Sequence, residues 1–262
     1  MQRWPAEAIW EAVVPDLPGF TVEVLPQIDS TNTELMRRAR AGQLEPILLV
    51  AERQTAGRGR LGRQWHSEAT NAGATSSAVS SLTFSLALPL SPSDWSGLSL
   101  VVGLSVAQSL HPDLRLKWPN DIWFQDRKLA GILIETASFD GIRYAVVGVG
   151  INLQPPGAQG LSTPPAWLAE LLPDLDAAQT LLRVVAPLVR VVQAFQMQGF
   201  EPFRPRFAEL DGLAGRAVTL SDGTTGTAQG VDDTGALLVH TSLGMKTINS
   251  SEVSVRPTPG PG

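Results

Sequence analysis

Residues 54–65 read QTAGRGRLGRQW and are more informative than any other stretch of the chain. Three glycines and three arginines lie within residues 57–63, and Trp65 closes the run. Glycine lets the backbone approach a ligand closely, while arginine supplies forked, charged donors that suit carboxylate and phosphate oxygens. The run therefore predicts a cationic loop, hinged on glycine, that folds over an anionic group and keeps water away from it.

The same run also matches the G-x-G-x-x-G pattern of dinucleotide-binding folds, at residues 57–62 after a predicted strand at 46–52. That fold needs a helix that opens at the glycines and an acidic residue about 20 positions later. Residues 63–67 show no helical apolar period, and residues 69–92 contain no Asp or Glu. The pattern disfavours a dinucleotide site, but a solvated basic surface loop remains an alternative that the rest of the chain has to decide.

Length and composition narrow the class of protein. The chain has 262 residues, 43% of them apolar and 17% charged, which predicts one large soluble domain plus a small one. The net charge of −5 disfavours non-specific nucleic-acid binding, so the arginines form a local site. The absence of cysteine excludes disulfides and thiol catalysis and is compatible with the cytoplasm. The first residues lack a signal-peptide pattern, and the sequence predicts no membrane-spanning run.

Periodicity predicts alternating strands and helices in the first half of the chain. Strands are expected at 21–25, 47–53 and 82–88, with an extended, flexible Ser/Ala/Gly/Thr loop at 66–81. A capping box of Thr31 and Glu34 opens a helix over 32–41 that ends at Gly42. A buried helix is predicted at 97–110. Two hairpins should then follow, with strands at 114–117, 122–124, 129–136 and 144–152.

The second half of the chain has a different pattern, with one long helix followed by short strands. Residues 177–197 have a long helical pattern that Pro187 should kink or split in two. Beyond Gly212, short strands are expected at 216–220, 224–231, 236–240, 246–248 and 253–256, separated by turn residues. Five short strands in so few residues predict a small barrel of SH3-like size, followed by a disordered tail at 257–262.

Three further runs carry candidate chemistry. KWPND at 117–121 places a lysine, an amide and a carboxylate around a rigid turn, which would suit magnesium and polyphosphate. KLAGIL at 128–133 begins with a lysine before an apolar strand, and GVGIN at 148–152 permits a close approach before Asn152. Taken singly, each is explained as well by an ordinary turn, a solvated hairpin or a strand bulge.

Taken together and in this order, these runs and the DSTN motif at 29–32 closely resemble the signature of biotin protein ligases. The resemblance is strong over 28–152, and the order of elements extends it to the C-terminus. It implies an α+β fold with a mixed β-sheet flanked by helices, of the class II synthetase-like biotin–lipoate ligase type. A catalytic domain is expected at 1–211, and a small SH3-like β-barrel with its tail at 212–262.

The resemblance implies ATP-dependent biotinylation of a specific lysine on biotin carboxyl carrier protein through biotinyl-5′-AMP. The substrates would be biotin and ATP, with Mg²⁺. Neutral donors and acceptors suit the ureido ring of biotin, and cations suit its carboxylate and the reacting phosphate. The positions that match the family's biotin contacts are Ser30, Thr31, Asn32, Gln54, Arg58, Gly59, Arg60, Lys128 and Gly131.

The resemblance also implies roles in adenylation. Lys128 is expected to stabilise the α-phosphate and then the leaving AMP, and Arg60 to hold the adenylate as the loop orders and closes. Lys117 would meet the β,γ-phosphates. Asn120 and Asp121 could hold Mg²⁺, or Asp121 could orient or deprotonate the incoming lysine. The positions that match ATP or adenylate contacts are Arg58, Arg60, Trp65, Lys117, Asn120, Lys128 and Asn152.

The sequence departs from the family pattern at two places, and these departures affect the function and the pocket wall that we expect. Only about 28 residues precede the DSTN motif, too few for the DNA-binding winged helix and linker that many members carry. A monofunctional ligase with no nucleic-acid or membrane partner is therefore expected, and by resemblance a homodimer. Residues 71–81 resemble an insertion, so a pocket wall could come from Leu82, Phe84 or Ser85.

Two other functions remain open. A lipoate or octanoate ligase or transferase would have a similar fold and would also acylate carrier lysines, but GRGR-x-GR together with KWPND suits biotinylation better. A non-catalytic, biotin-responsive binding module is the second alternative, and the retention of Arg60 and Lys128 argues for turnover instead.

Overall fold

The computed structural model describes residues 3–65, 79–155, 164–249 and 255–258. Its main body is a seven-stranded mixed sheet in the order β1-β2-β3-β7-β6-β5-β4, in which β1 and β2 are parallel and the other neighbours antiparallel. The strands are β1 Thr21–Leu25, β2 Ile47–Ala51, β3 Ser81–Pro89, β4 Arg115–Lys117, β5 Asp121–Phe124, β6 Arg127–Phe139 and β7 Ile142–Asn152.

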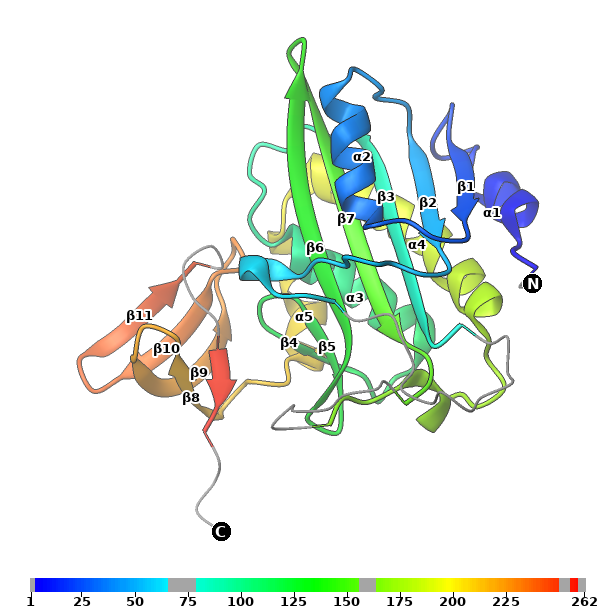
Figure 1. Cartoon of the computed structure of the whole chain (residues 1–262). Coiled ribbons are helices and arrows are strands. Elements are labelled where there is room, and N and C mark those ends of the chain that lie inside the picture. The colour runs from blue at the N-terminus through cyan, green and yellow to red at the C-terminus, as the bar shows by residue number, and fades with distance from the viewer. Residues whose placement is uncertain (1–2, 66–78, 156–163, 250–254, 259–262) are drawn as a thin grey trace.

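Helices cover both faces of this sheet (Figure 1). One face carries α2, and the other carries α3 and α4, which pack against each other. The helices are α1 Ala6–Val13, α2 Thr31–Arg40, α3 Leu98–Leu110, α4 Ala177–Gln198 and α5 Arg204–Leu210, with 3-10 turns η1 Arg60–Gly62, η2 Leu168–Glu170 and η3 Glu201–Phe203. The predicted mixed sheet flanked by helices is confirmed, while α1 and α5 were not predicted.

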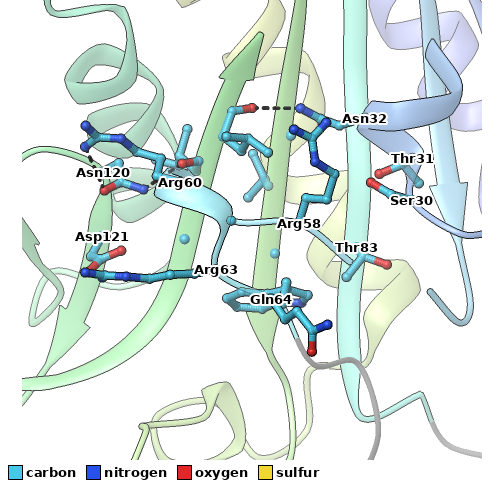
Figure 2. A pocket seen from close by; sticks show the side chains of 18 of the residues that line it. Ser30, Thr31, Asn32, Arg58, Arg60, Arg63, Gln64, Thr83, Asn120 and Asp121 are labelled. Carbon is cyan, nitrogen blue, oxygen red and sulfur yellow. Dashed lines mark hydrogen bonds between the residues drawn. The ribbon is translucent and has the colours of Figure 1, made fainter. Parts of the chain in front are cut away.

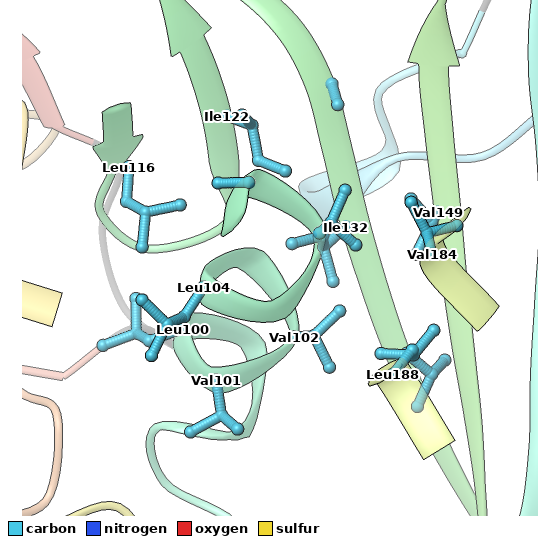
Figure 3. Close-up of a cluster of buried hydrophobic side chains, with 14 of the residues drawn as sticks. Leu100, Val101, Val102, Leu104, Leu116, Ile122, Ile132, Val149, Val184 and Leu188 are labelled. Carbon is cyan, nitrogen blue, oxygen red and sulfur yellow. The ribbon is translucent and has the colours of Figure 1, made fainter. Parts of the chain in front are cut away.

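The core lies between the sheet and the α3–α4 pair. In Figure 3, Val102 of α3 points toward Leu188 of α4, and Ile132 of β6 lies near the same side of α3. Nearly every residue of α3 is buried, since the sheet covers one side of the helix and α4 the other. This burial explains why the sequence of α3 is apolar around its whole circumference.

Helix α4 is continuous from Ala177 to Gln198, so the predicted possibility that Pro187 splits it is wrong. Pro187 lacks the N–H that would bond one turn back, but Val184 and Leu188 on either side of it are fully buried and hold the helix in place. By length and composition alone, α4 could cross a membrane. Its apolar face belongs to the core instead.

The C-terminal strands form a second, antiparallel sheet in the order β11-β10-β9-β8-β12. They are β8 Ala217–Leu220, β9 Thr225–Val231, β10 Leu237–Thr241, β11 Gly244–Ile248 and β12 Val255–Pro257. Within the ranges described, β11 and β12 do not pair to close the sheet into a barrel. Pro257 belongs to β12, so the predicted tail begins too early. Residues 66–78 of the expected flexible loop, and residues 259–262 of the tail, lie outside the described ranges.

The second sheet is anchored on the turn between β4 and β5. The indole nitrogen of the fully buried Trp118 donates to the carbonyl of Gly235 at 3.0 Å. Gly235 also lies so close to Gly97, at the start of α3, that a Cβ on Gly235 would sit 2.9 Å from the Gly97 Cα. The turn that carries KWPND is therefore packed between the two sheets.

Asp211 lies where the two sheets meet, in a bridge to Leu116. Its Oδ1 accepts from the Leu213 amide at 2.8 Å, whereas its buried Oδ2 has no hydrogen-bond partner among the described residues. Burial raises the pKa of this carboxyl, because the charged form loses its hydration.

We expect Asp211→Asn to raise the melting temperature at pH 7 by about 2 °C, since it removes a buried, poorly compensated charge. The raised pKa means that the native carboxylate costs stability at neutral pH, and that this cost disappears as the pH falls below that pKa toward 3.8. Thermal unfolding from pH 4 to 8 measures the effect. A gain that does not shrink in acid would contradict this explanation.

Candidate active site

The candidate site is built at the carboxyl ends of the parallel strands β1 and β2. An isolated parallel bridge between Ile28 and Gln54 extends this pair beyond the strands, and the Ala56 amide donates to the Asp29 carbonyl at 2.9 Å. Equivalent ends of parallel strands lie at the same edge of a sheet. The DSTN motif and the start of the glycine–arginine loop are therefore neighbours, although more than twenty residues separate them.

The N-terminus of α2 carries a polar network. Ser30 caps the helix by accepting from the Thr33 amide at 3.4 Å. The amide and hydroxyl of Thr31 both donate to Gln54 Oε1, at 2.7 and 3.1 Å. Ser85 Oγ lies 2.7 Å from both Thr31 Oγ1 and Asn32 Oδ1. These buried polar groups satisfy one another and offer hydroxyl and amide atoms at one end of a cleft.

The glycine–arginine loop is folded back on itself. The Gly59 amide donates to the Arg63 carbonyl at 2.7 Å, and the Trp65 amide donates to the Gly57 carbonyl at 2.9 Å. A side chain at position 57 would overlap the carbonyl oxygen of Trp65, so glycine is required there. The 3-10 turn η1 forms the tip of the loop, where Leu61 has a φ of 55°.

Glycines form the floor of the cleft. On β7, a Cβ at Gly148 would overlap Asn32 Oδ1, and one at Gly150 would lie 2.5 Å from the Trp65 ring. Gly131 pairs with Gly150 in register and lies under Lys128 and Trp65. Both the helix α2 and the loop can approach the sheet here because these strand positions have no side chains.

Positive charge gathers around one carboxylate. The Lys128 ammonium lies 2.7 Å from Asp121 Oδ1, and the Lys117 ammonium lies 3.6 Å from Asp121 Oδ2. Lys128 also lies 5.7 Å from the centre of the Trp65 ring. Burial lowers the pKa of Lys117, an effect that Asp121 opposes and Lys128 reinforces.

Two loop arginines extend this positive cluster. Arg60 Nη1 donates to Asn120 Oδ1 at 3.4 Å, and Asn120 Nδ2 donates in turn to the Ile132 carbonyl at 2.7 Å. Burial lowers the pKa of Arg60, and Arg63 adds repulsion, while Asp121 acts in the opposite direction. Figure 2 shows Arg63 beside Asp121 at the same side of the cleft. The cluster holds more cationic than anionic side chains and suits a polyphosphate.

These groups share an open cleft of about 890 Å³, including its solvent-open part. The DSTN hydroxyls and amide lie at one end and the cationic cluster at the other, with the loop across the opening (Figure 2). Such a cleft can hold a neutral polar head and an anionic tail in line. The predicted site residues that line it are Ser30, Thr31, Asn32, Gln54, Arg58, Gly59, Arg60, Trp65, Lys117, Asn120, Asp121, Lys128 and Gly131.

Asn152 is the predicted site residue that does not line this cleft. Its amide donates to the carbonyls of Ala166 and Lys128, at 3.0 and 3.4 Å. It therefore ties β7 and the start of β6 to the segment before η2. Of the suggested pocket-wall residues, Phe84 lines the cleft, Ser85 supports it through the α2 network, and Leu82 is part of the core.

Asn120 and Asp121 make a poor magnesium site without a phosphate. Both oxygens of Asp121 face lysines, and the Asn120 oxygen accepts from Arg60. Within the described ranges, no cluster of three or more His, Asp or Glu side chains could hold a metal ion. Mg²⁺ is commonly bound through one or two carboxylates together with substrate phosphates, and this donor set fits only that mode.

Sequence reasoning missed several side chains of the site. Arg63 and Gln64 line the cleft but were quoted only as part of the loop. Thr83 lines it from β3, and Glu135 accepts from Asn32 and Arg58 at its edge. The repeat of arginine within the loop could have indicated Arg63. The contribution of Glu135 depends on strand register, which the sequence did not provide.

Two family models match the chain. Residues 24–152 match the Biotin/lipoate A/B protein ligase family, and residues 214–256 match the Biotin protein ligase C terminal domain. The first match contains the residues of the cleft, and the second falls on the C-terminal sheet.

The chain is similar over most of its length to curated ligases. It is 34% identical over 255 residues to the Bifunctional ligase/repressor BirA of Escherichia coli (strain K12), an alignment that covers 93% of this chain and 77% of that protein. It is 31% identical to the Biotin--[acetyl-CoA-carboxylase] ligase of Paracoccus denitrificans, and this alignment covers 88% of this chain and 98% of that protein. A solved structure, biotin protein ligase from Aquifex aeolicus in complex with biotin and ATP, superposes with a TM-score of 0.75 at 32% identity. The superposition covers 90% of this chain and 99% of that one.

We expect Gly148→Ala to weaken the binding of labelled biotin about tenfold or more, because the added methyl group displaces Asn32 from the polar network. Gly131→Ala is the matched comparison, since its methyl group would meet mainly the flexible end of Lys128, and it should weaken binding less. Equilibrium binding with a thermal-unfolding control measures both. Equal losses in the two variants would contradict the role of Asn32.

Proposed function

Because this chain belongs to the biotin protein ligase family, we propose that it joins biotin to ATP as biotinyl-5′-AMP and then transfers the biotinyl group to a lysine of a biotin carboxyl carrier protein. The observation that carries this proposal is the shared cleft, in which a neutral polar end lies in line with a cationic end. The 98% coverage of the Paracoccus denitrificans ligase supports the same acceptor class, a carboxylase carrier domain.

We assign the polar end of the cleft to the ureido ring of biotin. Ser30 and Thr31 supply hydroxyls, and Gln54 and Asn32 supply amides, and all four side chains are buried. Thr31 is bonded to Gln54, and Ser85 links Thr31 to Asn32. A neutral, cyclic urea can exchange hydrogen bonds with such groups without bringing a charge into the pocket. The backbone of Arg58 and Gly59 would cover the ligand from the loop.

In the first step, an oxygen of the biotin carboxylate attacks the α-phosphorus of ATP, and the bond to the bridging oxygen of pyrophosphate breaks. Negative charge spreads over the phosphate oxygens in the transition state, so catalysis rests on positioning and electrostatic stabilisation. Lys128 and Arg60 are proposed to meet the α-phosphate. Lys117, whose pKa is lowered by burial, and the neighbouring Asn120 would meet the leaving pyrophosphate.

In the second step, the neutral amine of the carrier lysine attacks the acyl carbon, AMP leaves, and the amine loses a proton. Asp121 is the carboxylate closest to the cationic cluster and is proposed to orient this amine. Lys128 would stabilise the departing AMP, and Trp65 would contact its adenine ring. Asn152 is proposed to act near the ribose by fixing the end of β7.

Magnesium is proposed to enter as part of the MgATP substrate. Its contribution would be to neutralise phosphate charge, with Asn120 or Asp121 as protein ligands once the phosphates are present. The surplus of cationic side chains around Asp121 supports the entry of Mg²⁺ together with ATP, because these side chains would repel a free Mg²⁺ ion until ATP brings its own negative charge.

Three further attributes belong to the proposal. The protein is expected to act in the cytoplasm and to form a homodimer through an edge of the main sheet, with neither nucleic acid nor a membrane as a partner. Within the described residues, β1 and β4 are the edge strands of the main sheet. A lipoate or octanoate ligase is the alternative function, since the first family model covers both classes.

Incubation with ATP, Mg²⁺, a carrier domain and labelled biotin or lipoate tests the function. We expect the carrier lysine to be labelled by biotin, with release of pyrophosphate and AMP, and not by lipoate. The reason is the array of neutral hydroxyl and amide groups at the end of the cleft, which suits a urea better than a dithiolane. Labelling by lipoate alone would replace this function with the alternative.

We expect Lys128→Ala to slow pyrophosphate release about 100-fold or more while changing biotin affinity far less, because charge on the α-phosphate develops in the transition state. Lys246→Ala is the matched control. Lys246 also pairs with an aspartate and is similarly exposed, 46% against 41% for Lys128, but it lies in the C-terminal sheet. An unchanged rate of pyrophosphate release in Lys128→Ala would refute the assignment.

A further inference from the structure

Glu135 joins two parts of the cleft that the sequence keeps far apart. Its Oε2 accepts from Asn32 Nδ2 at 3.0 Å, at the N-terminus of α2. Its Oε1 accepts from Arg58 Nη1 at 2.9 Å, in the glycine–arginine loop. The carboxylate is thus the point at which the loop is fastened to the polar end of the pocket.

The contact with Asn32 fixes the orientation of a buried amide. Asn32 is 4% exposed, and its Nδ2 donates both to Glu135 and to the Leu133 carbonyl. A flipped amide would bring its oxygen against two acceptors, so Oδ1 must face Ser85. Ser85 is in turn bonded to Thr31, and Thr31 to Gln54.

The contact with Arg58 directs that side chain along the edge of the cleft and away from the cationic cluster. Arg58 is half exposed, and an exposed ion pair alone contributes little. Glu135 is only 20% exposed and is held by Asn32 as well. A carboxylate held by a buried partner loses little freedom when it binds a second group, so Arg58 meets a preformed acceptor.

We propose that Glu135 is a positioning residue that couples closure of the glycine–arginine loop to the hydrogen-bond network at the biotin end of the cleft. The coupling rests on the proposed function. Biotin that engages Thr31 and Gln54 would further order the Asn32 amide, and with it the carboxylate that fastens the loop. Among the described residues, the side-chain bonds of Glu135 go to Asn32 and Arg58, and Glu135 is not in the cleft lining. It would therefore affect retention of the adenylate more than its formation.

A protease assay tests the coupling without relying on activity. Trypsin cleaves after arginine, and the loop offers Arg58, Arg60 and Arg63. We expect Glu135→Gln to speed cleavage of this loop about threefold, the loss expected for one partly exposed pair. Added biotin should protect the loop less in this variant than in the unsubstituted protein.

Glu170→Gln is the matched control for this assay. Glu170 also pairs with an arginine, Arg127, and its side chain is likewise 20% exposed, but the pair lies outside the cleft lining. This variant should be cleaved at the loop like the unsubstituted protein. Mass spectrometry of the fragments identifies the bond that is cut, and thermal unfolding checks that both variants are folded.

Release of preformed biotinyl adenylate gives the functional readout. In Glu135→Gln we expect release to be about threefold faster and KM for biotin to be higher, while kcat for pyrophosphate formation stays unchanged. Arg58→Gln should release adenylate at least as fast as Glu135→Gln, and the double variant should be no faster than Arg58→Gln alone, because Glu135 is proposed to act on the loop through this contact. Chymotrypsin, which cleaves at Leu61 and Trp65, replaces trypsin for the Arg58 variants.

The outcomes separate the two proposals. Loop cleavage and adenylate release that are unchanged in Glu135→Gln would overturn the coupling, as would additive effects in the double variant. If the unsubstituted protein forms no biotinyl adenylate, the proposed function fails, whereas the protease comparison still decides whether Glu135 fastens the loop. A fall in kcat equal to the rise in release would assign Glu135 a role in the chemistry and would also overturn its assignment as a positioning residue.

Discussion

Asp121 allows this site to exist before any ligand is bound. Lys117 and Lys128 come from different strands, β4 and β6, and both ammonium groups face the one carboxylate. Without it, two lysines and the nearby loop arginines would repel one another in a partly buried cleft. With Asp121 in place, the cluster keeps a net positive charge that attracts a polyphosphate, while the carboxylate reduces the repulsion between the cations in the folded protein. The pairing of β5 with its two neighbours contributes to this geometry, because it places Asp121 opposite Lys117 on β4 and opposite Gly131 on β6, the strand that also carries Lys128.

Local patterns predicted the framework well where one physical rule dominates. The predicted capping box of Thr31 and Glu34 is wrong, because Ser30 caps α2 and Glu34 pairs with Arg37 and Arg38, but the helix itself is where it was expected. The last predicted hairpin and the apolar run of α3 also gave correct elements, with bounds that differ by a few residues. The mixed sheet flanked by helices followed from their order and from the family resemblance. Pro187 shows the limit of such rules. Its intrinsic preference argues against a continuous helix, and burial of the neighbouring side chains outweighs that preference.

The site was less visible in the sequence where it depends on strand register. Glycines 148 and 150 could be predicted to permit close approach, but only the fold reveals that Asn32 and Trp65 make use of that space. Asn152 was predicted near the nucleotide from its motif, and its amide is engaged with backbone carbonyls outside the cleft lining. Ser85 and Glu135 bond to side chains that are distant in sequence, Thr31 for Ser85 and Asn32 for Glu135, so no local pattern could identify these partners.

The packing of Trp118 against Gly235 has a consequence for how this chain can vary. The C-terminal sheet holds, through one carbonyl, the same bend from which Lys117 and Asp121 project. Exchanging that sheet for one from a distant relative would therefore succeed only if the replacement brought a residue without a side chain to the same spot against Gly97. Recombination between such proteins would need to preserve the contact of Gly235 with Gly97 and Trp118, even though the two sheets have separate hydrogen-bond ladders.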